Sequence, residues 1–94
     1  MRFASCDCAQ KFDRGEDIEM VSAMCKLHGI DTVRTVSDGC LEIFGGIGYF
    51  EDNPYGPVER MYRDARALWF EEGPRTVQRL TIARPLIAAA GEIR

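Results

Sequence analysis

Two adjacent carboxylates, Glu71-Glu72, follow the aromatic pair Trp69-Phe70 and stand directly before Gly73-Pro74. A carboxylate set among aromatic side chains and beside a helix-breaking glycine can be desolvated, which suits a general base that removes a proton from a substrate. The other interpretation is structural, because acidic side chains are favoured at the N-terminus of a following helix. Residue chemistry alone favours the structural interpretation and keeps the general base as an alternative.

A glycine cluster, Gly45-Gly46-Ile47-Gly48, lies upstream of these carboxylates. Glycines let a backbone approach a phosphate closely. The spacing is not the G-x-G-x-x-G of a dinucleotide-binding turn, and the cluster follows a helical pattern rather than a strand, so a Rossmann fold is excluded. The simplest interpretation is a helix C-terminus with left-handed glycines. This is compatible with a helix end that also contacts a ligand.

Cys6-x-Cys8 and Cys25-x-x-His28 supply four soft side chains that could bind a metal. Zinc ligands usually lie on turns, whereas Cys25 and His28 fall inside a helical pattern. The residues therefore favour cysteines that pack as small buried hydrophobic groups, and we predict neither a metal site nor a disulfide framework.

The composition of the 94 residues excludes several classes of partner. The net charge is −3 with no basic run, which argues against a nucleic acid. No apolar stretch approaches the ~20 residues that span a bilayer. The first residues contain no signal-peptide pattern, so we expect a cytosolic (cytoplasmic) chain. The length allows one domain at most.

Apolar residues at steps of three and four predict an all-α chain of about three to four helices. The strongest pattern runs from Asp17 to about Phe44, and its register is not reset at Gly29, which predicts one continuous helix. Shorter helices are predicted over 3–13, with Gly15 as the residue that ends the helix, over 57–68, and from Pro74 onward with Pro85 inside. The predicted buried stripes of the long helix and the last helix are Met20, Met24, Leu27, Ile30, Val33, Val36, Cys40 and Ile43, and Val77, Leu80, Ala83, Ile87 and Ala90.

The predicted long helix is longer than the diameter of a compact domain of this size. A helix of about 28 residues is roughly 42 Å long. A compact domain of ~100 residues is roughly 33 Å across. We therefore expect the helix to need neighbours outside this chain, either a partner subunit or another part of the same protein.

Residues 25–87, about two thirds of the chain, resemble the C-terminal end of the acyl-CoA dehydrogenase family. Residues 25–38 resemble the family's long helix. Leu41–Tyr49, L-E-I-F-G-G-I-G-Y, resembles Q-I-x-G-G-x-G-Y. Pro57–Arg66, P-V-E-R-M-Y-R-D-A-R, resembles P-V-E-R-L-Y-R-D-A-R almost letter for letter. Glu72–Arg84 resembles E-G-T-S-E-I-Q-R-L-V-I-A-R.

The resemblance implies a partial up-and-down helical bundle and an oxidoreductase of fatty acid metabolism. The family oxidises acyl-CoA to trans-2-enoyl-CoA, with a glutamate taking the α-proton and FAD accepting a hydride. The matching positions imply Glu72 as the base, with Glu71 and Gly73 at the substrate. The implied FAD contacts are Glu42, Gly45 and Gly46 from a neighbouring subunit, and Pro74 and Thr76 from the same subunit.

Three positions depart from the family pattern. Glu42 replaces a glutamine and puts negative charge near a phosphate-rich ligand. Pro74 replaces a threonine and removes a hydroxyl and an N–H. Glu71 replaces a usually aromatic residue of the acyl pocket. An anionic Glu71 beside the base could raise the pKa of the base, or could mark a member with an altered substrate or no dehydrogenase activity.

The family's N-terminal helical domain and central β-domain have no counterpart in residues 1–94. We therefore expect this single C-terminal segment to be inactive alone. It would require a homo-oligomer or a partner subunit that supplies the missing domains. The alternative is a non-catalytic helical interaction or oligomerisation module, as in a truncated or split paralogue.

Overall fold

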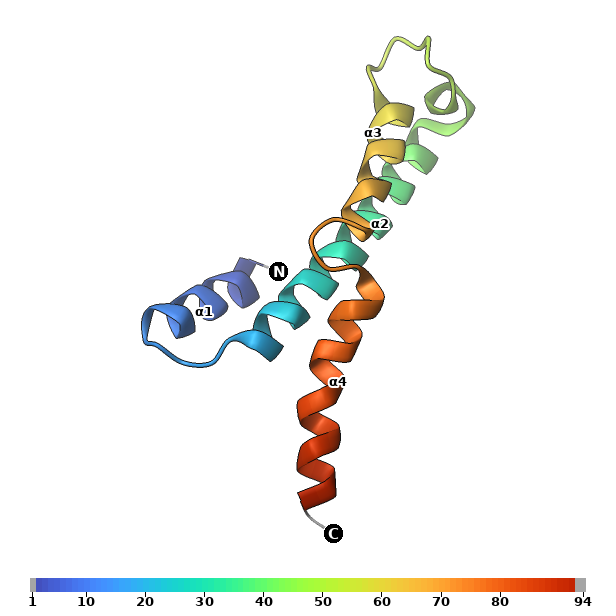
Figure 1. Ribbon diagram of the computed structural model, residues 1–94. Coiled ribbons are helices and arrows are strands. Elements are labelled where there is room, and N and C mark those ends of the chain that lie inside the picture. Colours follow the sequence, from blue (N-terminus) through green and yellow to red (C-terminus); the bar gives the residue numbers. More distant parts are fainter. Residues whose placement is uncertain (1, 93–94) are drawn as a thin grey trace. The chain divides into compact units, whose positions relative to one another are not determined.

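The computed structural model describes residues 2–92 and holds four α-helices and one 3₁₀ turn in that range, with no strand (Figure 1). The all-α class predicted from the sequence is confirmed. The helices fall into two units, divided after Gly29 and after Glu72. The first unit contains α1, the first part of α2, and α4. The second contains the rest of α2, α3 and the 3₁₀ turn η1. The bounds are α1 (Arg2–Asp13), α2 (Glu19–Tyr49), α3 (Val58–Ala65), η1 (Arg66–Trp69) and α4 (Arg75–Glu92).

Helix α1 ends where the sequence predicts. Gly15 has φ +77°, and its N–H donates to the carbonyl of Phe12 at 2.9 Å. The N–H of Glu16 donates to the carbonyl of Lys11 at 3.0 Å. These two bonds form a Schellman motif, in which a left-handed glycine lets the chain turn back and satisfy the last carbonyls of the helix.

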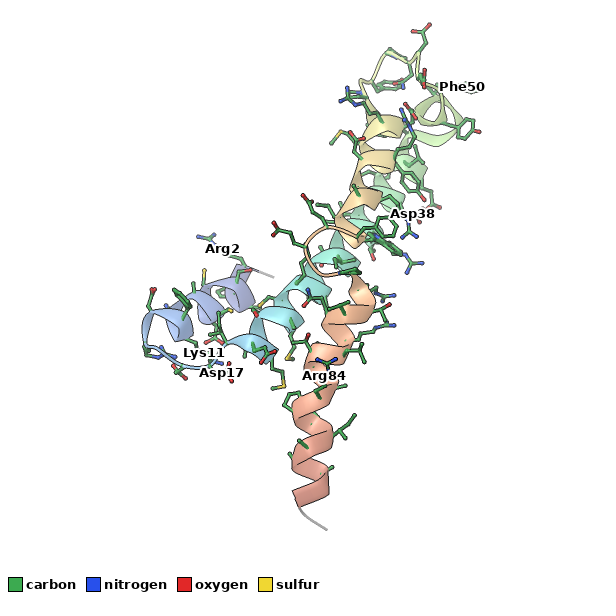
Figure 2. All side chains as sticks on the ribbon, viewed as in Figure 1. Arg2, Lys11, Asp17, Asp38, Phe50 and Arg84 are labelled. Carbon is green, nitrogen blue, oxygen red and sulfur yellow. The ribbon has the colours of Figure 1, made fainter. Side chains whose placement is uncertain are left out.

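Helix α2 begins at a side-chain cap and continues through Gly29, as predicted. The carboxylate of Asp17 accepts a hydrogen bond from the N–H of Glu19 at 3.0 Å, which satisfies one of the unpaired donors of the first turn. Figure 2 shows Asp17 on the connection between α1 and α2. Gly45 leaves helical geometry (φ 63°, ψ −152°), and the helix resumes after it as far as Tyr49. The predicted end near Phe44 is therefore where the regular part of the helix stops.

The loop after α2 is organised by Asn53. Its side-chain oxygen accepts the N–H of Tyr55 at 2.9 Å, and its amide nitrogen donates to the carbonyl of Phe50 at 2.7 Å. An asparagine that bonds to nearby backbone groups fixes a tight turn. Pro57 then takes the N-cap position of α3, and its carbonyl accepts the N–H of Met61 at 2.9 Å. The predicted helix over 57–68 is divided in the structure into α3 and η1.

Pro74 opens α4, as predicted, by accepting the N–H of Gln78 at 3.0 Å. The helix continues through Pro85. Because proline has no N–H, the carbonyl of Thr81 receives no helical hydrogen bond from position 85. The helix tolerates this loss where the side chains around Pro85 are exposed.

Few apolar side chains are buried within residues 2–92. Ala23 and Ile30 are the buried apolar residues, 3% and 2% exposed. The predicted stripe of α2 is only partly covered. The predicted buried stripe of α4 is wrong for this chain, because Val77, Leu80 and Ile87 are 47%, 49% and 69% exposed. Periodicity identifies the apolar side of a helix, but burial requires an element that covers it. None of the described helices is long and apolar enough to cross a membrane.

Truncating the buried side chain of Ile30 tests whether this small core stabilises α2. We expect Ile30→Ala to lower the free energy of unfolding by about 2 kcal/mol, through lost apolar burial and the cavity left behind. The matched control is Val36→Ala on the same helix, where the side chain is 56% exposed. That change should stay within about 0.5 kcal/mol. Urea unfolding followed by far-UV circular dichroism measures both, and equal effects would show that the core does not matter.

Helix α3 contains a bidentate ion pair between Glu59 and Arg63, which are one helical turn apart. Arg63 donates to both carboxylate oxygens of Glu59, at 2.8 and 3.0 Å. These hydrogen bonds, together with the positive charge of Arg63, lower the pKa of Glu59 below its ordinary value of 4.5. A second pair on the same helix joins Arg60 and Asp64 at 3.4 Å, with both side chains exposed.

Because the pKa of Glu59 is lowered, the stability of α3 should depend on pH, and the direction of that dependence follows from the shift. The pair stabilises the helix above pH 4.5 and is lost as the pH falls through the lowered folded pKa, where Glu59 takes up a proton. We expect Glu59→Gln to reduce helicity slightly at neutral pH and to match the unsubstituted chain in strong acid. Circular dichroism across an acid titration measures this. Glu51→Gln is the control, because its contact with Arg63 is 3.9 Å long and exposed. Parallel titrations of the Glu59→Gln variant and the parent would contradict the prediction.

Candidate functional site

The glycine-rich end of α2 exposes backbone that side chains do not cover. Gly45 has a backbone conformation that is essentially restricted to glycine, and a Cβ built on Gly45 or Gly46 meets nothing within 4 Å. Gly48 differs, because it is buried and a Cβ there would lie 2.6 Å from the Cβ of Phe44. The first two glycines therefore leave room for a ligand, whereas the third is required by packing. Glu42 lies one turn before Gly45 and Gly46 with its side chain exposed.

Aromatic rings hold the following loop against this helix end. The rings of Phe44 and Tyr55 lie 5.4 Å apart with a 39° tilt. Tyr49 and Phe50 meet edge to face at 5.5 Å. Contacts of this kind add to apolar burial. Figure 2 shows Phe50 in the loop beyond the end of α2. The break at Gly45 thus leads into an ordered loop.

The carboxylate pair lies on a sharp corner after η1. The N–H groups of Phe70 and Glu71 both donate to the carbonyl of Ala67, at 3.1 and 3.2 Å, which closes the turn. Glu72 then takes φ 44° and Gly73 φ 97°. Glu72 is the one non-glycine residue with a positive φ in residues 2–92. A non-glycine residue in the left-handed region is strained, and such strain concentrates at functional sites.

Gln78 fixes the backbone on the far side of this corner. Its side-chain amide donates to the carbonyl of Gly73 at 3.2 Å. A Cβ on Gly73 would collide with that amide, and its φ is unfavourable for any other residue. Pro74 and Thr76 follow at the start of α4 with exposed side chains. The glycine of the Glu72-Gly73 pair is therefore required by backbone geometry and by the packing of Gln78.

The aromatic pair before the corner contacts arginines rather than the carboxylates. The guanidinium carbon of Arg66 lies 3.6 Å from the centre of the Trp69 ring and 5.2 Å from that of Phe70. Arg34 of α2 lies 5.0 Å from the Trp69 ring. Glu71 and Glu72 are both exposed. Desolvation of a carboxylate by Trp69 and Phe70, the alternative kept open from the sequence, is not seen within this chain, and a ring face attracts a cation more strongly than an anion.

The Arg34–Trp69–Arg66 stack also lines a groove that the sequence did not reveal. The groove has a volume of about 950 Å³, lies within the second unit, and is lined by Arg34, Asp38, Tyr62, Arg63, Arg66 and Trp69 among others. The spacing of Arg66 and Trp69 on one side of a helical turn was a detectable signal. Nothing in the sequence links Arg34 to Trp69, since they are far apart along the chain.

The predicted site residues fall into three segments. Glu42, Gly45 and Gly46 lie at the end of α2, and Glu71 and Glu72 lie after η1; both segments belong to the second unit. Gly73, Pro74 and Thr76 belong to the first unit, at the start of α4. Within residues 2–92 no group of three or more histidine, cysteine or acidic side chains could hold a metal ion.

Comparison with known proteins identifies the family of this chain. The family model of the acyl-CoA dehydrogenase C-terminal domain matches residues 1–87, which include every site residue named above. The match defines the class as a helical C-terminal domain. The chain belongs to the acyl-CoA dehydrogenase family.

Individual relatives agree with the family model. The chain is 37% identical over 82 residues to a cyclohexane-1-carbonyl-CoA dehydrogenase of Geobacter metallireducens, covering 87% of this chain and 21% of that protein. It is 40% identical over 75 residues to an acryloyl-CoA reductase (NADH) of Anaerotignum propionicum, covering 80% and 18%. It is 36% identical over 80 residues to a probable acyl-CoA dehydrogenase of Mycobacterium leprae, covering 84% and 20%. The chain thus spans about a fifth of the length of these relatives.

Two neighbouring glycines of the cluster should respond in opposite ways to the same substitution. Gly45→Ala puts a Cβ on a backbone of φ 63° and ψ −152° and should destabilise the chain by about 1–3 kcal/mol. Gly46→Ala lies in helical backbone with open space and should be neutral or stabilise by up to about 1 kcal/mol. Thermal unfolding followed by circular dichroism compares them. A Gly46 variant as unstable as the Gly45 variant would contradict this account of the helix break.

Proposed function

We propose that this chain is the C-terminal part of an acyl-CoA dehydrogenase-like flavoprotein in which Glu72 is the catalytic base. The observation that carries the proposal is the strained backbone of Glu72, directly before a glycine that no other residue can replace without strain. This backbone geometry sets the direction in which the Cα–Cβ bond of Glu72 leaves the chain. A base must be held in a defined position toward the proton it removes, so a rigid corner suits this role.

The proposed reaction is oxidation of an acyl-CoA thioester to the trans-2-enoyl-CoA. A carboxylate oxygen of Glu72 takes the proton from the carbon next to the thioester carbonyl. FAD, when bound, supplies the acceptor for the hydride that leaves the β-carbon. Since the same glutamate returns the proton in the reverse direction, it also suits a reductase. The names of two relatives, a cyclohexane-1-carbonyl-CoA dehydrogenase and an acryloyl-CoA reductase, agree with either direction on a CoA thioester.

The end of α2 fits a phosphate-bearing cofactor such as FAD. The uncovered backbone at Gly45 and Gly46 permits close approach of a pyrophosphate. Among the proposed cofactor contacts, Glu42 is unfavourable for phosphate binding. Its exposed carboxylate repels phosphate unless its charge is neutralised by a proton or a cation. Pro74 can offer only its carbonyl and ring, whereas the exposed Thr76 keeps a hydroxyl for the same ligand.

The proposed site requires further protein around it. Glu71 and Glu72 are exposed in this chain, and a base that works on a carbon acid needs water to be excluded. Large apolar side chains are also exposed, including Ile43, Ile47, Leu86 and Ile87. We propose that the family's N-terminal and central domains, from a homo-oligomer or a partner subunit, cover these surfaces. In that assembly Glu71 and Gly73 border the acyl group. The proposed location is the cytoplasm, and the proposed role lies in fatty acid metabolism.

The exposed apolar faces also favour a second candidate function, a helical module that packs on a complete subunit without chemistry. Both candidates predict association with the missing domains, so association alone does not separate them. Turnover that depends on Glu72 separates them, because only the catalytic candidate requires that carboxylate.

Glu72→Gln in the flavin-containing assembly tests the proposed base. We expect kcat for acyl-CoA oxidation to fall by roughly 10²–10⁴-fold, with flavin content unchanged, because the amide keeps the shape and loses the basicity. Dye-coupled turnover measures kcat, and the flavin absorbance before substrate is added measures flavin content. Bleaching of that absorbance under anaerobic conditions measures flavin reduction. The substrates are cyclohexane-1-carbonyl-CoA and a straight-chain acyl-CoA.

The matched control is Glu71→Gln, which makes the same change one residue earlier. It should alter KM or substrate preference more than kcat, since Glu71 is proposed to border the acyl group. Unchanged turnover in the Glu72→Gln assembly would exclude Glu72 as the base. An assembly that binds flavin, but whose flavin is not bleached by any of the acyl-CoA substrates, would favour the non-catalytic module.

A further inference from the structure

A sulfur contact joins α1 to α2 within the first unit. The thiol of Cys25, on α2, donates a hydrogen bond to the backbone carbonyl of Ala4, on α1, with a sulfur–oxygen distance of 3.4 Å. These residues are 21 positions apart, so the contact reports packing of one helix on the other. The Sγ atom of Cys25 therefore lies against the turn of α1 that contains Ala4.

Helix geometry places a second thiol at the same turn. Cys8 is four residues after Ala4 on α1, which puts both residues on one face. Side chains of a helix lean toward its N-terminus, so the side chain of Cys8 covers the turn of Ala4. Cys8 and Cys25 are both half-buried, whereas Cys6 and Cys40 are exposed. Burial and the neighbouring Cys8 thiol both raise the pKa of Cys25 above its ordinary value.

We propose that Cys8 and Cys25 form a redox-sensitive thiol pair, which hydrogen peroxide or a related peroxide oxidises to a disulfide that links α1 to α2. The bond would close the loop formed by the end of α1, the Gly15 turn and the Asp17 cap. It would hold α1 on α2 covalently, at a position where the Cys25 thiol now donates a weak hydrogen bond to the carbonyl of Ala4. This site is independent of the proposed acyl-CoA chemistry.

The oxidation proceeds in two balanced steps. The thiolate of Cys8 attacks one oxygen of the peroxide, the O–O bond breaks, and a sulfenic acid and a hydroxide ion form. The sulfur of Cys25 then attacks the sulfenic sulfur, the S–S bond forms, and the sulfenic oxygen leaves as water with the thiol proton. Two thiols and one peroxide thus give one disulfide and two waters. In the second step Cys25 reacts as the thiol, which agrees with the burial and the neighbouring Cys8 thiol that raise the pKa of Cys25.

The test uses the full chain under native conditions. The chain at about 10 µM is treated with hydrogen peroxide, remaining thiols are alkylated, and the tryptic digest is analysed by mass spectrometry. We expect two of the four thiols to be lost, with the peptide of residues 3–11 linked to that of residues 15–26. Intramolecular closure at an effective concentration of about 1 mM should exceed cross-linking between chains by roughly 10²-fold.

Cys6 shares its tryptic peptide with Cys8, so matched variants identify the reacting thiol. Cys6→Ser should keep the link and Cys8→Ser should abolish it, with circular dichroism confirming that both variants retain their helices. In concentrated urea the selectivity should disappear, because the helices no longer align the thiols. A link that survives Cys8→Ser, fails in Cys6→Ser, or forms equally well in urea would overturn the proposal. Should a variant lose its helices, fragmentation of the linked peptide from the four-cysteine chain still decides between Cys6 and Cys8.

Discussion

Backbone hydrogen bonding at the helix ends determines most of this structure, because little apolar surface is buried. Within residues 2–92 the buried apolar side chains are those of Ala23 and Ile30. The ends of the helices are instead fixed locally. Gly15 closes α1 through two backbone bonds, and Asp17 caps α2. Each device satisfies groups that a helix leaves unpaired, so the boundaries persist without a large core.

Local hydrogen bonds also lie on both sides of the corner after η1, where the proposed base Glu72 is located. Before the corner, the carbonyl of Ala67 accepts two backbone N–H groups. After it, the side-chain amide of Gln78 donates to the carbonyl of Gly73. Between these hydrogen bonds, Glu72 and Gly73 both have positive φ, 44° and 97°. A strained residue such as Glu72 persists only where the surrounding structure holds it, and these hydrogen bonds hold the residues on either side of Glu72.

The sequence predicts the local features of this chain well and the non-local ones poorly. The continuous α2 through Gly29, the Schellman glycine at position 15 and the start of α4 at Pro74 all follow from local patterns, and all are observed. The stripe of α4 was assigned correctly as apolar and wrongly as buried. The pairing of Trp69 with Arg34 joins distant residues, so no spacing rule could reveal it. The family motifs predict a functional role for Glu72-Gly73, whereas spacing alone favours a helix cap; that role stays a prediction.

Positioning and tuning of the proposed base, Glu72, are separate requirements, and this chain contributes to the first. The corner positions Glu72 through backbone geometry that residues 67–78 supply themselves. Tuning requires a low-dielectric surrounding, and the nearby aromatic rings are already engaged by Arg66 and Arg34. The ring of Trp69 therefore contacts two guanidiniums, and under the proposed function an apolar wall against Glu72 would come from other protein. Burial of Glu72 by other protein would supply such surroundings, as the proposed function requires.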